Sequence, residues 1–200
     1  MAIHPLLVFL ATLAYGLVHS ILASLWAKSR AQQWLGSLAE RGYRLAYNLF
    51  ATVSLLPVLA LPALLPDRRL YVIPFPWVLL SSGVQLLALA ALGIGLLQTG
   101  VVSFLGLRQL VRSPGKEAPS LVAKGLYRYV RHPLYTAGLV LIWLVPVMSV
   151  NLLALNLGLS LYILVGTYYE ERKLRREFGA DYEAYMRRTP MLIPGSRHGN

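Results

Sequence analysis

The chain of 200 residues contains no cysteine at all and only eight acidic residues. The absence of cysteine excludes disulfide bonds, thiolate metal sites and a cysteine nucleophile, although it does not fix the redox compartment. Charged residues of either sign make up only 14% of the chain, whereas hydrophobic residues make up 56%. A soluble domain does not have this composition, so we expect an integral membrane protein.

The few acidic residues stand against 19 Lys and Arg, which gives a formal net charge of +11. In a membrane protein, a basic excess reports orientation and attraction to anionic lipid. The charge therefore does not argue for nucleic acid, and no stretch resembles a nucleic-acid-binding module. We expect membrane lipids as partners and no nucleic acid, and the sequence leaves the oligomeric state open.

Long runs without charge predict five membrane helices, since a bilayer core of roughly 30 Å needs about 20 helical residues. The first run carries no Lys or Arg before it and is too long for a cleavable signal peptide, so we expect a mature helix. The last two helices are predicted to form a tight helical hairpin, whose first arm is short for a full crossing. The fold class is thus all-α, a polytopic membrane protein with five transmembrane helices and a cytoplasmic C-terminal tail. The predicted helices are 5–26, 45–66, 77–97, 134–147 and 152–169.

The distribution of Lys and Arg predicts the orientation of these helices. The connecting segments hold three such residues in 27–42, two in 67–69, six in 98–131 and seven after Tyr169. Because basic residues favour the cytoplasmic side, the richest segments are expected there together, with the N-terminus outside. Residues 98–130 are then a loop over the cytoplasmic face. We expect a multi-pass protein of a bacterial inner membrane.

The segment 125–138, GLYRYVRHPLYTAG, is a basic, aromatic loop that turns into an apolar helix at His132 and Pro133. Proline suits the first turn of a helix, so Pro133 is expected at its first position. A helix start leaves N–H groups unpaired and attracts anions, and Arg128 and Arg131 strengthen that field. The alternative interpretation is a membrane helix with basic and aromatic residues at its interface.

Two adjacent carboxylates, Glu170 and Glu171, come directly after the last predicted membrane helix on the basic side. A pair of carboxylates in this place favours a cationic ligand. Leu174 follows at helical spacing, so we expect the helix to continue and to end at Gly179. The alternative is an amphipathic tail in which Glu171 pairs with Arg175 one turn later.

Together the two motifs resemble the cofactor half of the isoprenylcysteine carboxyl methyltransferase and phospholipid methyltransferase superfamily. Two ordered motifs at a suitable separation are more specific than either alone. The resemblance covers 125–195, a little over a third of the chain, while the first three helices resemble more weakly a denitrification-associated bacterial membrane family. The matching residues are Gly125, Tyr127, Arg131, His132, Pro133, Tyr135, Gly138, Glu170, Glu171, Leu174, Phe178, Gly179, Tyr182, Tyr185, Arg188, Pro190 and Pro194.

The resemblance implies a methyltransferase that uses S-adenosyl-L-methionine without a Rossmann domain and without a metal. The methionine carboxylate of S-adenosyl-L-methionine is expected at the start of the helix at Pro133, and the ammonium or ribose of the same molecule at the paired glutamates. Arg188 matches the family position that holds the acceptor's carboxylate, and with Glu171 it forms the implied catalytic pair. The implied cofactor-binding residues are Gly125, Tyr127, Arg131, His132, Pro133, Tyr135, Glu170, Glu171, Leu174 and Tyr185. The chain is then a single membrane domain, 1–200, with a three-helix part, 1–97, and a cofactor-binding part, 98–200.

The acceptor stays open within this interpretation. A lipophilic or membrane-partitioned acceptor of the isoprenylcysteine type is preferred, and a phospholipid amine, an isoprenoid or a small thiol are the alternatives. A thiol or an amine needs a general base, for which the chain offers His19, His132, Tyr or Glu. A sterol-type NADPH reductase shares part of the pattern, but the paired glutamates disfavour a phosphate-rich dinucleotide. A non-catalytic membrane subunit is the third possibility.

Overall fold

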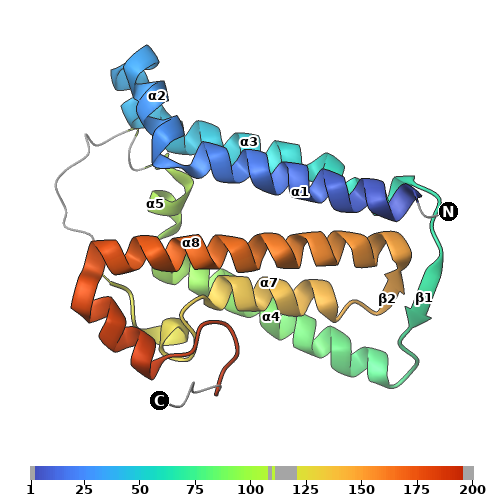
Figure 1. Cartoon of the computed structure of the whole chain (residues 1–200). Coiled ribbons are helices and arrows are strands. Elements are labelled where there is room, and N and C mark those ends of the chain that lie inside the picture. Colours follow the sequence, from blue (N-terminus) through green and yellow to red (C-terminus); the bar gives the residue numbers. More distant parts are fainter. Residues whose placement is uncertain (1–2, 108–109, 111–120, 196–200) are drawn as a thin grey trace. The chain divides into compact units, whose positions relative to one another are not determined.

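The computed structural model describes residues 3–107, 110 and 121–195. The described chain is mainly helical, with two short strands (Figure 1). Its elements in order are α1 (Ile3–Ala23), α2 (Leu25–Leu35), α3 (Ser37–Leu64), β1 (Arg69–Val72), α4 (Trp77–Thr99), α5 (Val101–Leu105), the 3-10 helix η1 (Gly125–Arg128), α7 (Pro133–Trp143), β2 (Val147–Ser149) and α8 (Val150–Arg188).

The chain divides into two compact units, and α8 continues from the first into the second. The first unit consists of Met1–Tyr71, Gly100–Glu117 and Met148–Tyr162, and the second of Val72–Thr99, Ala118–Val147 and Ile163–Asn200. Part of the predicted loop 98–130, namely 108–109 and 111–120, lies outside the described residues.

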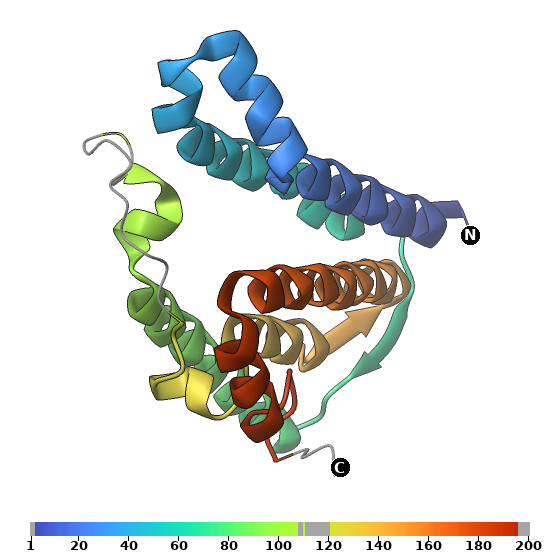
Figure 2. The same ribbon diagram turned by 60° about the vertical axis from the view of Figure 1, so that its left-hand side comes forward.

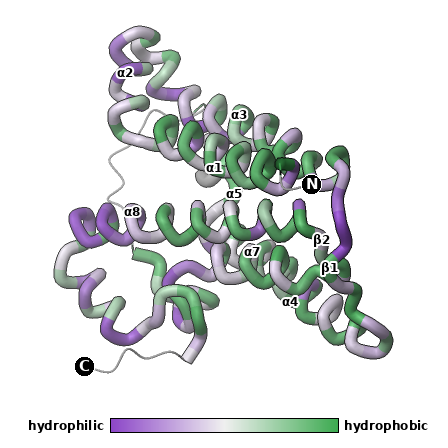
Figure 3. The backbone as a smooth tube through the Cα atoms, turned by 45° about the vertical axis from the view of Figure 1, so that its right-hand side comes forward, coloured by the Kyte–Doolittle hydropathy of each residue, from purple (hydrophilic) through white to green (hydrophobic). Residues whose placement is uncertain are grey.

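Among the described residues, four helices are long and apolar enough to cross a membrane: α1, α3, α4 and α8. Figure 3 shows α1, α3, α4 and α7 hydrophobic along most of their length, whereas α2 and the C-terminal part of α8 are hydrophilic. This pattern confirms a helical membrane protein. The prediction of five spans is not confirmed, because the predicted helix 134–147 is α7, which has 11 residues and ends at Trp143. About 20 residues are needed for a full crossing.

The sequence predicted an all-α fold, whereas the structure also contains the two short strands β1 and β2. At the ends of the strands, Ile73 N donates to Pro146 O over 2.8 Å and Val150 N donates to Arg68 O over 3.0 Å. β2 therefore separates α7 from α8, where the sequence predicted a direct helical hairpin. The pairing joins segments far apart in the chain, so no local pattern of residues signals it. The tight hairpin and the cytoplasmic placement of the tail stay predictions.

In the first unit, α1 packs along α3, and buried apolar side chains form the core. Polar side chains join the helices as well. His19 of α1 lies between two tyrosines: its Nε2 is 2.6 Å from Tyr47 Oη, and its Nδ1 is 2.5 Å from Tyr162 Oη. A polar side chain in the first predicted helix thus has its partners on neighbouring helices, as membrane helices require. The core residues are Val8, Val58, Ala154 and Leu155.

In the second unit, the shorter helix α7 packs against α4 (Figures 1 and 2). The Gln85 side chain of α4 donates to Leu141 O of α7 over 2.9 Å. Beyond its apolar part, α8 extends as a polar helix and bends at Gly179, where φ is 51°. Only glycine adopts this angle readily, so the predicted end of the helix at Gly179 is a bend after which the helix resumes. Figure 2 shows the last part of α8 turning away from the straight part.

Candidate functional site

The predicted start of α7 is confirmed. Pro133 is the first residue of the helix and His132 precedes it in a non-helical conformation, with φ −125° and ψ 65°. The first bond of the helix runs from Thr136 N to His132 O, at 3.0 Å. His132 is buried and its ring faces the polar extension of α8. The corner therefore brings a histidine, a helix start and the glutamates of α8 together.

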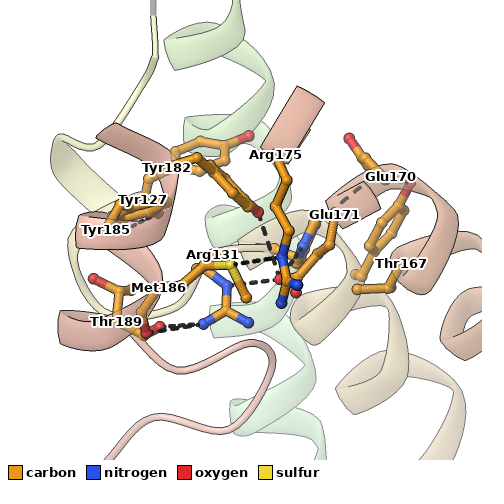
Figure 4. Close-up of polar contacts among 12 residues, drawn as sticks. Tyr127, Arg131, Thr167, Glu170, Glu171, Arg175, Tyr182, Tyr185, Met186 and Thr189 are labelled. Atoms are coloured by element: carbon orange, nitrogen blue, oxygen red, sulfur yellow. Dashed lines mark hydrogen bonds and ion pairs between the residues drawn. The ribbon is translucent and has the colours of Figure 1, made fainter. Parts of the chain in front are cut away.

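Glu171 is the buried member of the pair of glutamates, with 8% of the residue exposed. Three donors converge on its Oε1: Arg131 Nε at 2.6 Å, His132 Nε2 at 3.2 Å and Tyr182 Oη at 3.5 Å. Figure 4 shows Arg131 and Tyr182 beside Glu171. Burial alone would raise the pKa of Glu171, but the hydrogen bonds from His132 and Arg131 and their charges lower it to about 2. Glu171 is therefore an ionised carboxylate whose partners are groups of the chain itself.

Glu170 differs from its neighbour, since 43% of its side chain is exposed. The Tyr135 hydroxyl donates to Glu170 Oε2 over 2.9 Å, and His132 Nδ1 lies 3.7 Å from the same oxygen. The rings of His132 and Tyr135 are stacked, with centroids 5.6 Å apart and planes 15° apart. Glu170 is thus held by two side chains of the corner while part of its carboxylate remains accessible.

Arg131 connects Glu171 to the last turns of α8 and to Thr189, the residue that follows α8. Besides the bond from its Nε, its Nη1 donates to Thr189 O over 2.6 Å and to Met186 O over 3.3 Å (Figure 4). A planar guanidinium presents donors in a fixed fork, which suits simultaneous contacts of this kind. The side chain is only 9% exposed. Sequence reasoning paired Glu171 with Arg175 or with a ligand, whereas the structure gives it Arg131.

The segment after α8, residues 189–192, returns to the corner. The main-chain N–H groups of Arg131 and His132 donate to Pro190 O and Met191 O, over 2.9 and 3.2 Å. The Thr136 hydroxyl donates to Leu192 O over 2.7 Å. These contacts bind an irregular segment to the start of α7 through its carbonyl groups.

The loop before the corner is held by two other contacts. Gly125 has φ 62°, and a Cβ there would collide with the Gln98 side chain, whose Oε1 accepts from Leu126 N over 3.2 Å. The Tyr185 hydroxyl donates to Tyr127 O over 2.5 Å. Burial of Tyr185 raises its pKa to about 12, so the hydroxyl stays protonated as a donor. Gly125 and Tyr185 thus shape the loop.

The structure gathers most of the predicted site residues and leaves two outside the cluster. Leu174 is half-buried on α8. Arg188 is exposed in the last turn of α8, where its Nε donates to Ala184 O over 3.2 Å. Sequence reasoning did not select Tyr182, which is 1% exposed, although the family pattern contained it. The gathered residues are Gly125, Tyr127, Arg131, His132, Pro133, Tyr135, Glu170, Glu171 and Tyr185.

Comparison with known proteins places the chain in a family. The profile of the phospholipid methyltransferase family matches residues 77–181, which include the corner and both glutamates. The methanethiol S-methyltransferase of a Pseudomonas species is 31% identical over 196 residues, which cover 89% of this chain and 73% of that protein. No solved structure matches the chain.

Two relatives from Bradyrhizobium diazoefficiens show how the similarity is distributed. Methanethiol S-methyltransferase 1 is 30% identical over 198 residues, which cover 92% of this chain, and methanethiol S-methyltransferase 2 is 48% identical over 69 residues, which cover 34%. The matched residues amount to 64% of the length of the first relative and 27% of the second. Because the family profile covers more than half of the chain and a relative matches it nearly end to end, the chain belongs to the phospholipid methyltransferase family.

Proposed function

We propose that the chain is an integral membrane methyltransferase that transfers the methyl group of S-adenosylmethionine to a small thiol. The observation that carries this proposal is the match, over about nine tenths of the chain, to proteins named methanethiol S-methyltransferase. The family match favours a methyltransferase over the NADPH reductase. The names of the relatives favour the thiol over the prenylcysteine-type acceptor that the sequence motifs placed first.

The residues of the corner fit S-adenosylmethionine, which carries a cationic sulfonium, an ammonium, a carboxylate and an adenine. Glu170 offers a half-exposed carboxylate for a cationic group. The start of α7 favours an anion, because its first N–H groups have no partner within the helix and carry the positive end of the helix dipole. The ring of Tyr135 beside Glu170 offers an aromatic face for a cation.

The two glutamates have different roles in this proposal. Glu170 holds the cationic part of the donor, because it is accessible and is oriented by Tyr135 and His132. Glu171 orients the corner from within, because its carboxylate is buried and already accepts from Arg131 and His132. Glu171 therefore holds His132 in the position from which the ring also faces Glu170.

When bound, S-adenosylmethionine supplies an electrophilic methyl group on a positively charged sulfur. The task of the chain is then to align donor and acceptor and to exclude water. A thiol acceptor must pass its proton to a base, for which the corner offers His132 or Glu170, whereas an ionised carboxylate acceptor needs no base. A thiol also offers no carboxylate for a guanidinium, so the proposal needs no contact from Arg188, in keeping with its exposed place on α8.

Binding and transfer assays on the detergent-purified chain test the proposal. Calorimetric titration with S-adenosylmethionine and, separately, with NADPH distinguishes the two enzyme classes. Labelled donor is then supplied with methanethiol, a prenylcysteine or phosphatidylethanolamine. We expect binding of S-adenosylmethionine and transfer of label to methanethiol. Transfer only to the prenylcysteine or to the phospholipid contradicts the thiol proposal, and binding of NADPH alone contradicts the methyltransferase proposal.

A further inference from the structure

We propose that the C-terminal segment, residues 189–192, is a structural part of the donor site, and that Arg131 and Thr136 are positioning residues that fasten it to the start of α7. The proposal rests on the proposed function in one respect only, the dependence of donor binding on this segment. The fastening itself concerns the chain alone.

The contacts of Arg131 point to a positioning role. Its side chain is 9% exposed, and its donors face Glu171 Oε1 and the carbonyl oxygens of Thr189 and Met186. Arg131 therefore joins a buried carboxylate to the end of α8 and the segment that follows it. A guanidinium whose Nε and Nη1 donate to acceptors of the chain on two sides orients those groups.

The main chain of the C-terminal segment supports the same conclusion. Its carbonyl groups at Pro190 and Met191 accept from the N–H groups of the two residues directly before Pro133. Thr189 and Leu192 are buried, so the segment is packed although it forms no regular structure. Main-chain carbonyl groups outside helices and sheets need other hydrogen-bond donors, and here the donors are main-chain N–H groups of the corner that holds His132.

Thr136 provides a third attachment, one turn into α7. Its hydroxyl lies 2.7 Å from Leu192 O and 3.1 Å from His132 O, so the single proton has its shorter contact with the C-terminal segment. Attachments before and after Pro133 hold the segment across the start of the helix. If the segment is released, Arg131 loses Thr189 O as an acceptor, and its contact with Glu171, which orients His132, is held less firmly.

Two shortened chains test the dependence of the donor site on this segment. One ends at Arg188 and lacks the segment, and the matched control ends at Gly195 and retains it. We expect the chain that ends at Arg188 to bind S-adenosylmethionine at least about tenfold more weakly in calorimetry, because Arg131 and the corner it holds are no longer fixed. A factor of about ten in affinity is what the loss of one charge-assisted contact to the donor produces. The chain that ends at Gly195 should bind like the full chain. Equal affinity in both shortened chains overturns the dependence of the donor site on the segment.

Point variants test the fastening without any ligand. Limited trypsin digestion of the full chain reports cleavage after Arg187 and Arg188, next to the C-terminal segment. We expect faster cleavage in Arg131→Lys, which loses the fork, and in Thr136→Val, which loses the hydroxyl. The controls are Arg128→Lys, an exposed arginine of the same loop that contacts Tyr129, and Thr136→Ser, which keeps the hydroxyl; both should be cleaved at the rate of the unaltered chain.

The binding experiment and the digestion experiment test different parts of the proposal, so each can contradict its own part alone. Unchanged cleavage in both Arg131→Lys and Thr136→Val overturns the fastening. A full chain that does not bind S-adenosylmethionine overturns the proposed function and the role in donor binding, while the digestion still decides the fastening. Faster cleavage with unchanged donor affinity in Arg131→Lys keeps the fastening and overturns its role in the donor site.

Discussion

The two units of the molecule each hold a histidine between two polar side chains, and these partners differ in charge. In the first unit, His19 lies between the hydroxyl groups of Tyr47 and Tyr162. In the second unit, His132 lies between the carboxylates of Glu170 and Glu171. The first arrangement brings together neutral groups of three helices, whereas the second brings together ionisable groups and a buried guanidinium, Arg131.

The difference in charge between the two sets of partners distinguishes a contact that packs helices from a site that binds a ligand. Hydroxyl groups can join membrane helices without placing a net charge among them, and such bonds contribute modestly to stability. Carboxylates beside a histidine are stable in a buried place only with a compensating cation, which Arg131 provides for Glu171. Only Glu170 of this group retains an accessible carboxylate. We therefore place binding at the second histidine and helix packing at the first.

The largest effect on stability is expected for Glu171→Gln. The change leaves the buried Arg131 without its carboxylate, and removal of one partner of a buried pair typically costs about 3 kcal/mol or more. The free energy of unfolding, measured in detergent with a chemical denaturant, should fall by about that amount. Glu177→Gln on the exposed surface of the same helix is the control. Equal stability of the two variants would show that the buried pair does not hold the corner.

The low pKa of Glu171 predicts a second effect, on acid stability. Its folded pKa is about 2 and its ordinary value is 4.5, so its ionisation stabilises the folded chain fully above about pH 4.5. That contribution is lost as the pH falls from 4.5 towards 2. We expect the difference in unfolding temperature between the unaltered chain and Glu171→Gln to shrink over this range. A constant difference from pH 6 to pH 3 contradicts the ion pair.

A smaller effect on stability, and none on donor affinity, is expected for His19→Leu. The change removes the partner of Tyr47 and Tyr162, and hydrogen bonds between membrane helices contribute about 1 kcal/mol or less. Thermal unfolding should shift slightly, while the affinity for S-adenosylmethionine stays that of the unaltered chain. His4→Leu, near the start of the same helix, is the control. Loss of donor affinity in His19→Leu would break the distinction between the two histidines.

The smallest effect is expected for Arg188→Lys. With a thiol acceptor, kcat/KM should remain that of the unaltered chain, because no carboxylate of the acceptor needs the guanidinium fork. With a carboxylate acceptor, the loss of the fork should lower kcat/KM by about tenfold or more. Steady-state kinetics with methanethiol and with a prenylcysteine separate these outcomes.

Local rules of helix formation predicted several features that the structure confirms. Pro133 begins α7, because proline suits the first turn of a helix, and Trp77 begins α4 directly after Pro74 and Pro76. Gly179 was predicted as the end of a helix and is a bend. In each case the signal lies within a few residues of the feature.

Features that depend on distant partners were not predictable in this way. Glu171 has a basic residue one turn later, but its partner is Arg131, 40 positions earlier in the chain. The attachment of residues 189–192 uses carbonyl groups, which every residue has, so no residue type signals it. α7 is shorter than the uncharged run that predicted it, because the chain leaves the helix for β2.

The most direct test of the account is the affinity of Glu170→Gln for S-adenosylmethionine, measured by calorimetry on the detergent-purified chain. Glutamine keeps the shape of the side chain and removes the charge, so the fold should be retained while a charge-assisted contact of about 1.5 to 3 kcal/mol is lost. We expect binding at least about tenfold weaker than that of the unaltered chain and of the control Glu177→Gln. Unchanged affinity in Glu170→Gln would contradict the assignment of the donor to this corner.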